Sequence, residues 1–537
     1  MAVSPDIRNS SIDRLRTTKF DVLIIGGGIT GAGALLEASS RGYKAALIDK
    51  SDFASGTSQA SSKLIHGGLR YLANGEFALV YENLAERTRL LKNAPSIVKP
   101  LDFAIPLART NKVFDKFGVA QYTLALWGYD LTGGFRIGRL HRRAPLRTLK
   151  AMLPKLNLSK FSSSFLYRDA WCDDVRLTLA VISKAQDYFG AVAVNYIKAV
   201  EPTREAGDKT ISGFGVTSTY YGDLDVNKSF IIQADSIINA TGVDAIDIAS
   251  YASEPPQINI RPSKGVHIAF SQTSLPAKAA AVLPVPNDSR TIFVLPWGDY
   301  TYVGTTDTDL DNEIVATSEK DIQYLLSALN YSLLTPLNRQ LITGAWVGTR
   351  PLIESNNPKM SQRTKDLSRR HLVLTSSDKM ITIVGGKLTT YRKMAQDAVD
   401  AMDKVLGKTT NSISKTLSLE VPRTPEASLT NLSTRYGSRS QIVKNFVLGQ
   451  DSFIAHETWP LDLGEVDYMV YQEGALRLSD VLLRRIRVGI LDQGAAKAIA
   501  PEVLGRLAEL LNLNEDDQER ELIDFHSDLK RELPDES

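Results

Sequence analysis

Residues 57–72 gather side chains that can carry out acid–base and anion-binding chemistry. A histidine, an arginine and a tyrosine lie within six positions, at His66, Arg70 and Tyr71, beside paired glycines. Histidine titrates near neutral pH and suits proton transfer, and the arginine fork suits an anionic substrate. A hydroxyl-rich loop that caps a helix, with a solvated histidine, explains the same composition equally well. From these residues alone, both interpretations stay open.

A glycine-rich stretch near the N-terminus has the spacing of a dinucleotide-binding turn. It is a G-x-G-x-x-G motif made of Gly26, Gly27, Gly28, Ile29, Thr30 and Gly31. In such a turn the first glycine permits a tight bend, the second lets backbone approach a pyrophosphate, and the third lets helix and strand pack closely. Asp49 ends the next predicted strand, about twenty residues on, and Lys50 follows it. A carboxylate at that place can accept hydrogen bonds from a ribose. The motif predicts dinucleotide binding but does not separate FAD from NAD.

Further candidate residues stand later in the chain. Gly386 and Lys387 lie between an apolar run and a helical pattern, so a helix dipole and a positive charge there can face an electron-rich flavin edge. An ordinary strand–helix turn with a solvated lysine explains that pattern too. Arg350, Arg363 and His267 are isolated, and lone arginines and histidines are most often solvated or structural. Their residue types alone assign them no role.

Alternating strand and helix patterns must position these residues. Residues 20–25, 29–42 and 43–49 read as strand, helix and strand, which is a βαβ unit. Further strands are predicted at 191–200, 229–240 and 380–385, the last followed by a helix, and short separate strands between 258 and 306, including 258–262 and 266–271. The βαβ unit predicts a buried parallel sheet, and the short strands predict a second, antiparallel sheet. We therefore expect an α/β fold.

The composition describes a globular protein with sizeable cores. Of the 537 residues, 43% are hydrophobic and 23% charged, which excludes a wholly disordered chain. Lys and Arg number 63 against 61 Asp and Glu, so no charge excess indicates a nucleic-acid partner. Cys172 is the one cysteine, which excludes an intrachain disulfide, and no zinc-ligand spacing predicts a metal site. Without a secretory signal or an apolar run of ~20 residues, we expect a cytoplasmic chain with no spanning helix.

Taken in order along the chain, the motifs resemble those of FAD-dependent glycerol-3-phosphate dehydrogenases and the related glycerol-3-phosphate oxidases. Residues 57–72 are similar to the family signature. Further matches follow at 239–242, 264–267, 295–297, 304–307, 348–352 and 384–392. The resemblance implies a Rossmann-like FAD-binding domain of the glutathione-reductase-like type, as in relatives of D-amino-acid oxidase. It also implies an antiparallel-sheet substrate domain and a C-terminal helical cap domain.

The resemblance also suggests how the chain divides into domains. We expect a discontinuous FAD-binding domain made of 20–86, 165–245 and 362–405. The substrate domain is expected at 87–164 and 246–361, and the helical cap at 410–537. Residues 1–19 are expected to form an N-terminal tail.

The family pattern implies roles for the candidate residues. Those expected to bind the cofactor are Gly26, Gly27, Gly28, Ile29, Thr30, Gly31, Asp49, Lys50, Thr57, Ser58, Ser61, Ser62, Thr241, Gly242, Gly386, Lys387, Leu388 and Thr389. Those expected to bind substrate are Arg70, Tyr71, Arg350, Arg363 and Lys387. The catalytic set is His66, His267, Arg350 and Lys387, with one histidine assisting proton removal. The sequence does not say which histidine.

The activity implied by the resemblance is oxidation of sn-glycerol 3-phosphate to dihydroxyacetone phosphate, with electrons passed from FAD to a membrane quinone. Three alternatives remain: an oxidase that uses oxygen, a flavin-dependent amine or amino-acid oxidase, and a non-catalytic flavin-binding protein. The oxidases carry an insertion for which this chain has no room, which favours the dehydrogenase. A homodimer is compatible with the sequence.

Quinone reduction requires contact with a bilayer, and we expect peripheral attachment to the inner face of the cell membrane. Residues 116–150 are the best candidate for an anionic membrane surface to bind, because aromatic and apolar side chains precede a basic run. The apolar members are Phe117, Val119, Tyr122, Leu124, Leu126, Trp127, Tyr129 and Leu131, and the basic ones are Arg136, Arg139, Arg142, Arg143, Arg147 and Lys150. The same aromatics are equally suited to packing inside the substrate domain.

Overall fold

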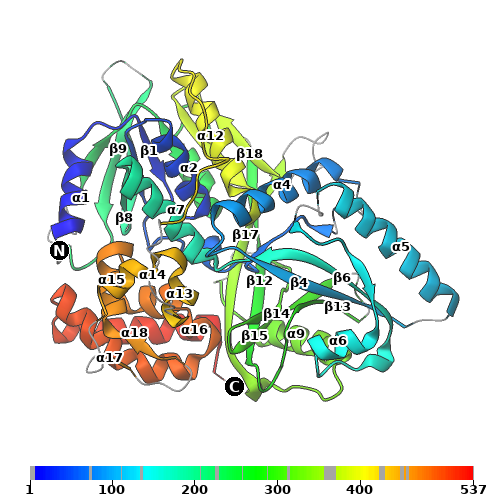
Figure 1. The fold of residues 1–537 in the computed structure, drawn as a ribbon. Coiled ribbons are helices and arrows are strands. Elements are labelled where there is room, and N and C mark those ends of the chain that lie inside the picture. Colours follow the sequence, from blue (N-terminus) through cyan, green and yellow to red (C-terminus); the bar gives the residue numbers. More distant parts are fainter. Residues whose placement is uncertain are drawn as a thin grey trace.

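In a computed structural model, the chain forms two parts built on sheets and one part built of helices (Figure 1). The structure describes residues 6–69, 71, 75–109, 112–133, 137–205, 207, 209–223, 229–256, 258–286, 288, 290–310, 315–355, 370–421, 430–447, 453–454 and 459–535. Within them, no helix is both long enough and apolar enough to cross a bilayer.

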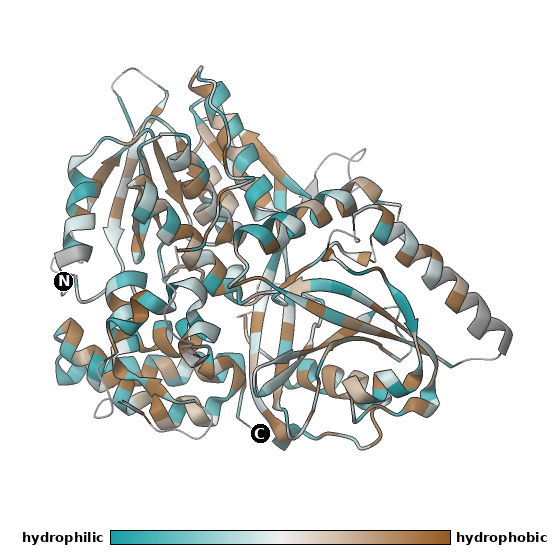
Figure 2. Cartoon of the chain, viewed as in Figure 1, coloured by the Kyte–Doolittle hydropathy of each residue, from teal (hydrophilic) through white to brown (hydrophobic). Residues whose placement is uncertain are grey.

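A mainly parallel sheet forms the first part, with an antiparallel strand at one edge. Its strands, in order, are β18 (His371–Thr375), β19 (Met380–Gly385), β11 (Ile237–Asn239), β1 (Val22–Ile25), β2 (Ala45–Ile48) and β7 (Val192–Val194). β1 and β2 are buried throughout because both sheet faces are covered, and Figure 2 colours the central strands mostly as hydrophobic. The helices on one face are α2 (Ile29–Ser40), α7 (Asp174–Phe189) and α12 (Tyr391–Val405).

The opposite face of this sheet carries a small antiparallel sheet and the N-terminal helix. The small sheet is made of β8 (Ile197–Arg204), β9 (Ile211–Ser218) and β10 (Phe230–Gln233). The expected tail instead contains α1 (Asp6–Thr17), whose Leu15 is fully buried beside the sheet because Ile12 and Leu15 form an apolar stripe. The single strand expected at 229–240 is two strands, β10 and β11, which belong to different sheets.

A larger, mostly antiparallel sheet forms the second part. Its strands are β16 (Thr308–Asp309), β12 (Ile258–Ser271), β15 (Tyr300–Gly304), β14 (Thr291–Trp297), β13 (Ala280–Pro284), β4 (Lys99–Ala108), β6 (Phe161–Trp171) and β3 (Leu64–Ile65), with β17 (Ile342–Ser355) beside β12 and β5 (Arg142–Ala144) beside β6. The helices around it include α4 (Phe77–Asn93), α5 (Lys112–Leu131), α6 (Leu146–Met152), α8 (Ala245–Ala249) and α9 (Glu319–Ser332). The two strands expected at 258–262 and 266–271 are the single strand β12, because its pairing with β17 continues through both.

The C-terminal part is helical. It contains α13 (Thr430–Tyr436), α14 (Ser440–Lys444), α15 (Leu463–Glu473), a π-helical turn (Asp480–Arg485), α16 (Val488–Leu491), α17 (Gln493–Leu511) and α18 (Glu515–Glu532), with β20 (Phe453–Ile454) and β21 (Leu461–Asp462). Its apolar side chains share one core with the large sheet, where Leu483 belongs to the same cluster as Leu295 and Trp346. Leu419 packs with the α2 side of the parallel sheet although we placed it in the cap. The fold class is confirmed, and the remaining domain boundaries stay predictions.

Candidate active site

Four of the sequence motifs meet at one edge of the parallel sheet. Strands β1, β2, β11 and β19 run parallel, so their carboxyl ends share that edge. The glycine turn follows β1, Asp49 follows β2, Thr241 lies two residues after β11, and Gly386 follows β19. In open α/β sheets, ligands bind outside the carboxyl ends of the strands. The topology therefore assembles the residues that the sequence assigned to a dinucleotide.

The glycine turn has the shape of a pyrophosphate cradle. Gly26 has a φ of 110°, and a Cβ there would lie 2.6 Å from the carbonyl oxygen of Ala240. A Cβ at Gly31 would lie 1.8 Å from the carbonyl oxygen of Gly26, so α2 packs on β1 at a distance that only glycine allows. A Cβ at Gly28 would meet only the side chain of Ser58, whose hydroxyl oxygen would be 3.0 Å away. The turn fits a pyrophosphate bound at the N-terminus of α2.

Asp49 and Ser58 hold the backbone of this turn. The carboxylate of Asp49 accepts hydrogen bonds from the backbone N–H of Gly27 at 2.6 Å and of Ser51 at 2.8 Å. Burial raises the pKa of Asp49 to about 6. The Ser58 hydroxyl accepts from the backbone N–H of Ile29 at 2.9 Å, in the first turn of α2. Contact of Asp49 and Ser58 with a cofactor stays a prediction.

Lys50 and the residues after β11 also lie at this edge. Lys50 is exposed and pairs with Asp244, the two charged groups being 2.7 Å apart. The Thr241 hydroxyl donates to the side-chain oxygen of Asn239 at 2.7 Å, and Gly242 has a φ of 66°. These contacts fix the turn that follows β11, which lies at the same edge of the sheet as the glycine turn.

The first half of the loop 57–71 is bound to the large sheet. The Thr57 hydroxyl donates to the carbonyl oxygen of Thr349 on β17 at 2.7 Å. The Ser62 hydroxyl oxygen lies 2.9 Å from Nε2 of His267 on β12. This half of the loop therefore lies beside the strands that carry His267 and Arg350.

The second half of the loop meets the turn after β19. The backbone N–H of His66 donates to the Thr389 hydroxyl at 3.1 Å, within the 3-10 turn Leu388–Thr390. The ammonium nitrogen of Lys387 lies 4.0 Å from the centre of the Tyr71 ring, a cation–π contact. The structure thus brings Lys387 together with His66 and Tyr71, which precede it in the sequence by more than 300 positions.

The surroundings of His66 favour its neutral form. Burial lowers the pKa of His66, and the positive charges of Lys387 and Arg87 lower it further, against the opposing charge of Asp169. A neutral imidazole at physiological pH is able to accept a proton.

A polar group behind His66, which sequence reasoning missed, holds the loop in place. The Tyr129 hydroxyl accepts from the backbone N–H of Gly67 at 2.9 Å and donates to the carboxylate of Asp169 at 2.7 Å. Asp169 also pairs with Arg87, and the Asn83 amide donates to the Gly67 carbonyl oxygen at 3.0 Å. A sequence signal for this group was the four-residue spacing of Asn83 and Arg87, which places both on one face of α4.

His267 is more deeply buried than its assignment as a catalytic residue implies. It is 1% exposed, and its ring stacks on Trp346 with centroids 4.8 Å apart. Burial, with the positive charges of Lys63 and Arg350, holds the pKa of His267 well below its usual range. Because Ser62 lies against Nε2, the ring supports the loop from behind.

Arg350 presents a partly open guanidinium. Its side chain is 37% exposed, with Nη1 3.1 Å from the carboxylate of Asp307 and Nη2 donating to the Thr305 hydroxyl at 3.2 Å. A Cβ at Gly265 would lie 2.7 Å from Nη2, so the side chain lies over a glycine that leaves it room. An anion can reach this group from the solvent side.

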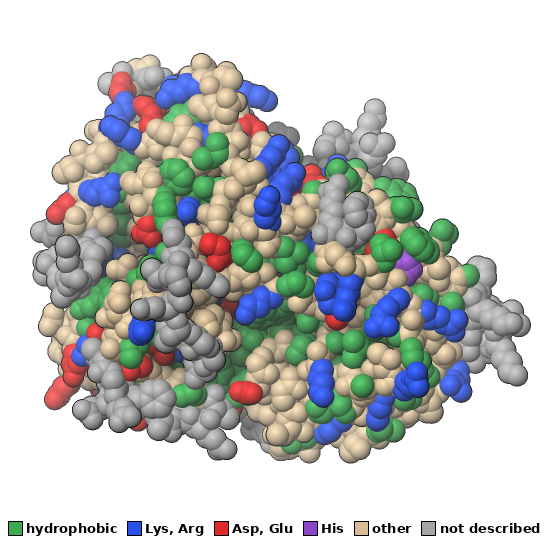
Figure 3. All heavy atoms as spheres, in the orientation of Figure 1, with side chains coloured by type: hydrophobic (Ala, Val, Ile, Leu, Met, Phe, Trp, Pro, Cys, Tyr) green, Lys and Arg blue, Asp and Glu red, His purple; other side chains and the backbone are tan. Residues whose placement is uncertain are grey.

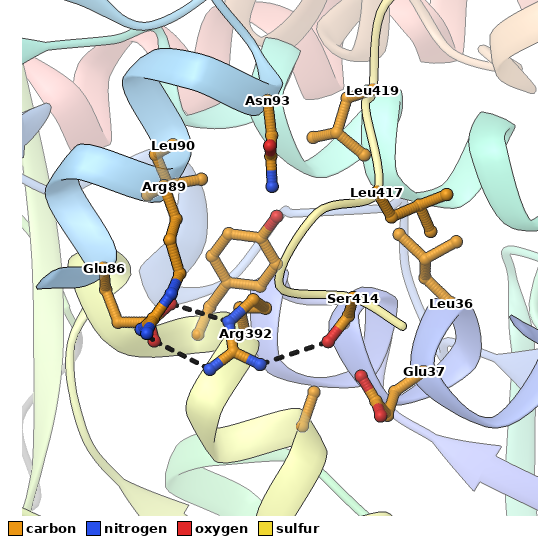
Figure 4. Close-up of a pocket in the computed structure, with 13 residues that line it drawn as sticks. Leu36, Glu37, Glu86, Arg89, Leu90, Asn93, Arg392, Ser414, Leu417 and Leu419 are labelled. Carbon is orange, nitrogen blue, oxygen red and sulfur yellow. Dashed lines mark hydrogen bonds and ion pairs between the residues drawn. The ribbon is translucent and has the colours of Figure 1, made fainter. Parts of the chain in front are cut away.

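Two of the other predicted cations, Arg70 and Arg363, lie outside the described residues. A further arginine of the motif after β19, Arg392, is structural. Its guanidinium pairs with both carboxylate oxygens of the buried Glu86 at 2.7 Å, beside a small cavity between α2, α4 and α12 (Figure 4).

Comparison with known proteins supports the fold and the cofactor that the sequence motifs predict. A family profile described as FAD dependent oxidoreductase matches residues 21–392, and one described as the C-terminal domain of alpha-glycerophosphate oxidase matches residues 377–518. In structure, the chain is similar to the glycerol-3-phosphate dehydrogenase from Bacillus halodurans complexed with FAD, with a TM-score of 0.78 over 99% of both chains and 24% identity. Together with the glycine turn, these matches define an FAD-dependent oxidoreductase.

Two curated relatives narrow the class. The chain is 34% identical over 555 residues to glycerol-3-phosphate dehydrogenase 2 of Mycobacterium tuberculosis, covering 99% of this chain and 92% of the relative. It is 33% identical over 543 residues to the mitochondrial glycerol-3-phosphate dehydrogenase of Homo sapiens, covering 94% and 72%. The chain therefore belongs to the glycerol-3-phosphate dehydrogenase family of FAD-dependent oxidoreductases, and the resemblance seen in its motifs is confirmed.

Proposed function

We propose that this protein oxidises sn-glycerol 3-phosphate to dihydroxyacetone phosphate with FAD and passes the electrons to a membrane quinone. The observation that carries the proposal is the double attachment of the loop 57–71. One half is bound to β17, which bears Arg350, and the other half to the turn that bears Lys387. A candidate base and two cations thus belong to one connected framework beside the glycine turn. Clustered cations are what a phosphate dianion requires.

The proposed chemistry divides between the cofactor and the chain. FAD, which the glycine turn Gly26–Gly31 would hold, would supply the acceptor for the hydride on C2 of the substrate. His66 accepts the proton of the C2 hydroxyl, and Lys387 and Arg350 bind the phosphate. We assign the base to His66 because it is only partly buried, whereas His267 is enclosed behind Ser62. Arg70 and Arg363 join the phosphate site through the family pattern.

We expect the acid limb of the kcat/KM profile to report His66. Because the protonated ring cannot accept a proton, kcat/KM falls about tenfold per pH unit below the pKa of His66. That pKa lies below its usual range in the wild type, so the limb lies at low pH. Replacing Lys387 with methionine removes a positive charge and raises the pKa of His66, so the limb moves to higher pH. A limb that stays in place in Lys387→Met contradicts this assignment.

Substrate choice separates the proposal from an amine or amino-acid oxidase. We expect the holoenzyme to reduce a soluble dye with sn-glycerol 3-phosphate, and to leave it unreduced with sarcosine or D-alanine. Turnover of either amine, without turnover of glycerol 3-phosphate, refutes the proposed substrate. Peroxide released at the rate of substrate oxidation, with no quinone reduction, identifies oxygen as the acceptor instead.

Helix α5 carries the apolar part of the surface proposed to contact the membrane. Leu124 and Leu131 are each 76% exposed, and Trp127 is 47% exposed. Leu126 and Tyr129, which we expected on the same surface, are buried in the core of the large sheet. The apolar surface is therefore one side of α5 rather than the whole segment, and Figure 1 shows α5 projecting from the body of the molecule.

A basic surface follows α5 along the chain. Arg139, Arg142, Arg143 and Arg147 are exposed, and Figure 3 shows Lys and Arg side chains gathered over the region of α6. Arg139 pairs loosely with Asp102 at 3.4 Å. These side chains are available to anionic lipid headgroups, which attract such clusters. Arg136 lies outside the described residues.

We expect the protein to sediment with anionic liposomes and not with neutral ones. Changing Arg139, Arg142 and Arg143 to Glu should release it, because the surface charge reverses next to the anionic lipid. Quinone reduction should fall with binding, while oxidation of glycerol 3-phosphate with a soluble dye should persist.

The matched control for the liposome experiment reverses the same number of charges elsewhere. Lys497, Arg520 and Lys530 are exposed on the C-terminal helices. Their change to Glu should leave sedimentation as in the wild type. Equal loss in both triple variants assigns the binding to overall charge, and wild type that stays in the supernatant with both lipids excludes this surface as the anchor.

A further inference from the structure

Three arginines of the C-terminal helical part reach into the loops that carry the cofactor and substrate residues. They are Arg484 and Arg485, in the π-helical turn, and Arg487 just after it. Figure 1 shows the C-terminal helices lying against the first sheet part and beside β15 and β17. Arg484 and Arg485 both donate to the buried carboxylate of Asp52, at 2.7 and 2.6 Å. Asp52 lies three residues after Asp49, so this contact anchors the loop after β2.

Arg487 is connected to the loop 57–71 through the buried carboxylate of Asp174. Nη2 of Arg487 lies 2.9 Å from Oδ1 of Asp174, and the ammonium of Lys63 lies 3.0 Å from Oδ2. Ser61 donates both its backbone N–H, at 3.1 Å, and its hydroxyl, at 2.7 Å, to the same carboxylate. The Gln59 carbonyl oxygen accepts from Arg487 at 2.7 Å and from Lys63 at 3.0 Å. Asp174 and Arg487 together therefore hold the loop at Gln59, Ser61 and Lys63.

The loop needs such support because its backbone is unusual at Lys63. Lys63 has a φ of 59°, in the left-handed region, and such a conformation persists only where its surroundings enforce it. Its ammonium lies 4.8 Å from the centre of the Trp346 ring, and the Trp346 indole N–H donates to the Ser61 carbonyl oxygen at 3.2 Å. The strand β3 and then His66 follow at once.

The contacts of Arg487 indicate a positioning role. Two buried cations, Lys63 and Arg487, face two carboxylates: both contact Asp174, and Asp173 lies 3.7 Å from Nε of Arg487. The charges are therefore balanced, as a buried cluster of ions requires. What Arg487 adds is a fixed fork that joins Asp174 to the Gln59 carbonyl and so sets the path of the loop.

We propose that Arg487 is a positioning residue. By joining Asp174 to Gln59, it fixes the loop 57–71 from the C-terminal part and so sets the position of His66. This inference rests on the reaction proposed above. The C-terminal helices then contribute to the active site from behind, without touching substrate. Loss of the Arg487 guanidinium should move His66 while leaving the Lys63–Asp174 pair intact.

The test replaces Arg487 with methionine or lysine in the full-length holoenzyme. In Arg487→Met we expect kcat with a soluble dye to fall roughly tenfold to a hundredfold, because the base is displaced. The change in KM should be smaller, because Arg350 and Lys387, which bind the phosphate, lie on other elements. Hydrogen exchange of peptides covering 57–71 should quicken. Arg487→Lys keeps the charge but not the fork-shaped guanidinium. Its kcat and its hydrogen exchange should lie between those of the wild type and those of Arg487→Met.

The control is Arg506→Met. Arg506 forms a two-bond pair with Asp467 inside the C-terminal part, at 2.7 and 2.6 Å, and contacts neither loop. It should lower Tm without changing kcat or the exchange of 57–71. Wild-type kcat and exchange in Arg487→Met overturn the proposal, as do equal changes in Arg506→Met.

Two further outcomes remain decisive. If Arg487→Met does not fold, Arg487→Lys is judged by the same two measurements. If the wild type does not oxidise glycerol 3-phosphate, the proposed function fails, and hydrogen exchange, which needs no substrate, still decides whether Arg487 positions the loop.

Discussion

Replacing Gly28 with valine is expected to empty the FAD site while the chain stays folded. A β-branched side chain at this position would occupy the space that the pyrophosphate needs. Within the protein, the new Cβ would meet only the side chain of Ser58 at the first residue before α2, and the φ of −73° suits any residue. Overpacking of this kind costs up to about 3 kcal/mol, so FAD should bind roughly a hundredfold more weakly.

The measurement for Gly28→Val is flavin content after purification and FAD affinity of the apoprotein, with Tm as the check on folding. Gly505→Val is the matched control, because a Cβ at Gly505 would meet nothing within 4 Å. It should keep full FAD occupancy. Full occupancy in Gly28→Val as well would remove the glycine turn from the cofactor site.

Arg350→Ala is expected to lower kcat/KM for glycerol 3-phosphate by about two orders of magnitude. Loss of a charge-assisted partner from a desolvated anion costs on the order of 3 kcal/mol, which is roughly a hundredfold. Stability should change little, because the partner carboxylate of Asp307 is 57% exposed and returns to water.

The control for Arg350 lies in the same sheet. Arg261 on β12 forms a similar exposed pair with Asp309 at 2.6 Å. Arg261→Ala should leave kcat/KM within a factor of about two, as for most surface changes. If both arginine variants behave like the wild type, Arg350 is not part of the substrate site.

The strands and turns at the cofactor edge were predictable from sequence because their signals are local. The apolar runs at 20–25 and 380–385 correspond to β1 and β19, and the glycine spacing gave the turn before α2. β12 was predicted as two strands because 261–264 interrupts the apolar run with polar residues and a proline. Its pairing with β17, about ninety residues later, overrides that interruption.

The parts of the site that sequence reasoning missed depend on contacts between distant segments. Lys63, Asp174 and Arg487 come from three regions of the chain, and no spacing rule connects them. The burial of His267 depends in the same way on Trp346. A histidine enclosed by an aromatic ring and an accessible one look identical in sequence. Motif analysis therefore found both histidines but did not distinguish their surroundings.

The central claim is tested most directly by adding glycerol 3-phosphate to the purified holoenzyme without oxygen and following the visible absorbance of the flavin. The account predicts that the flavin bleaches as one dihydroxyacetone phosphate forms per FAD, and that added quinone restores the colour. A flavin that stays oxidised in excess glycerol 3-phosphate, while dithionite reduces it, would contradict the account.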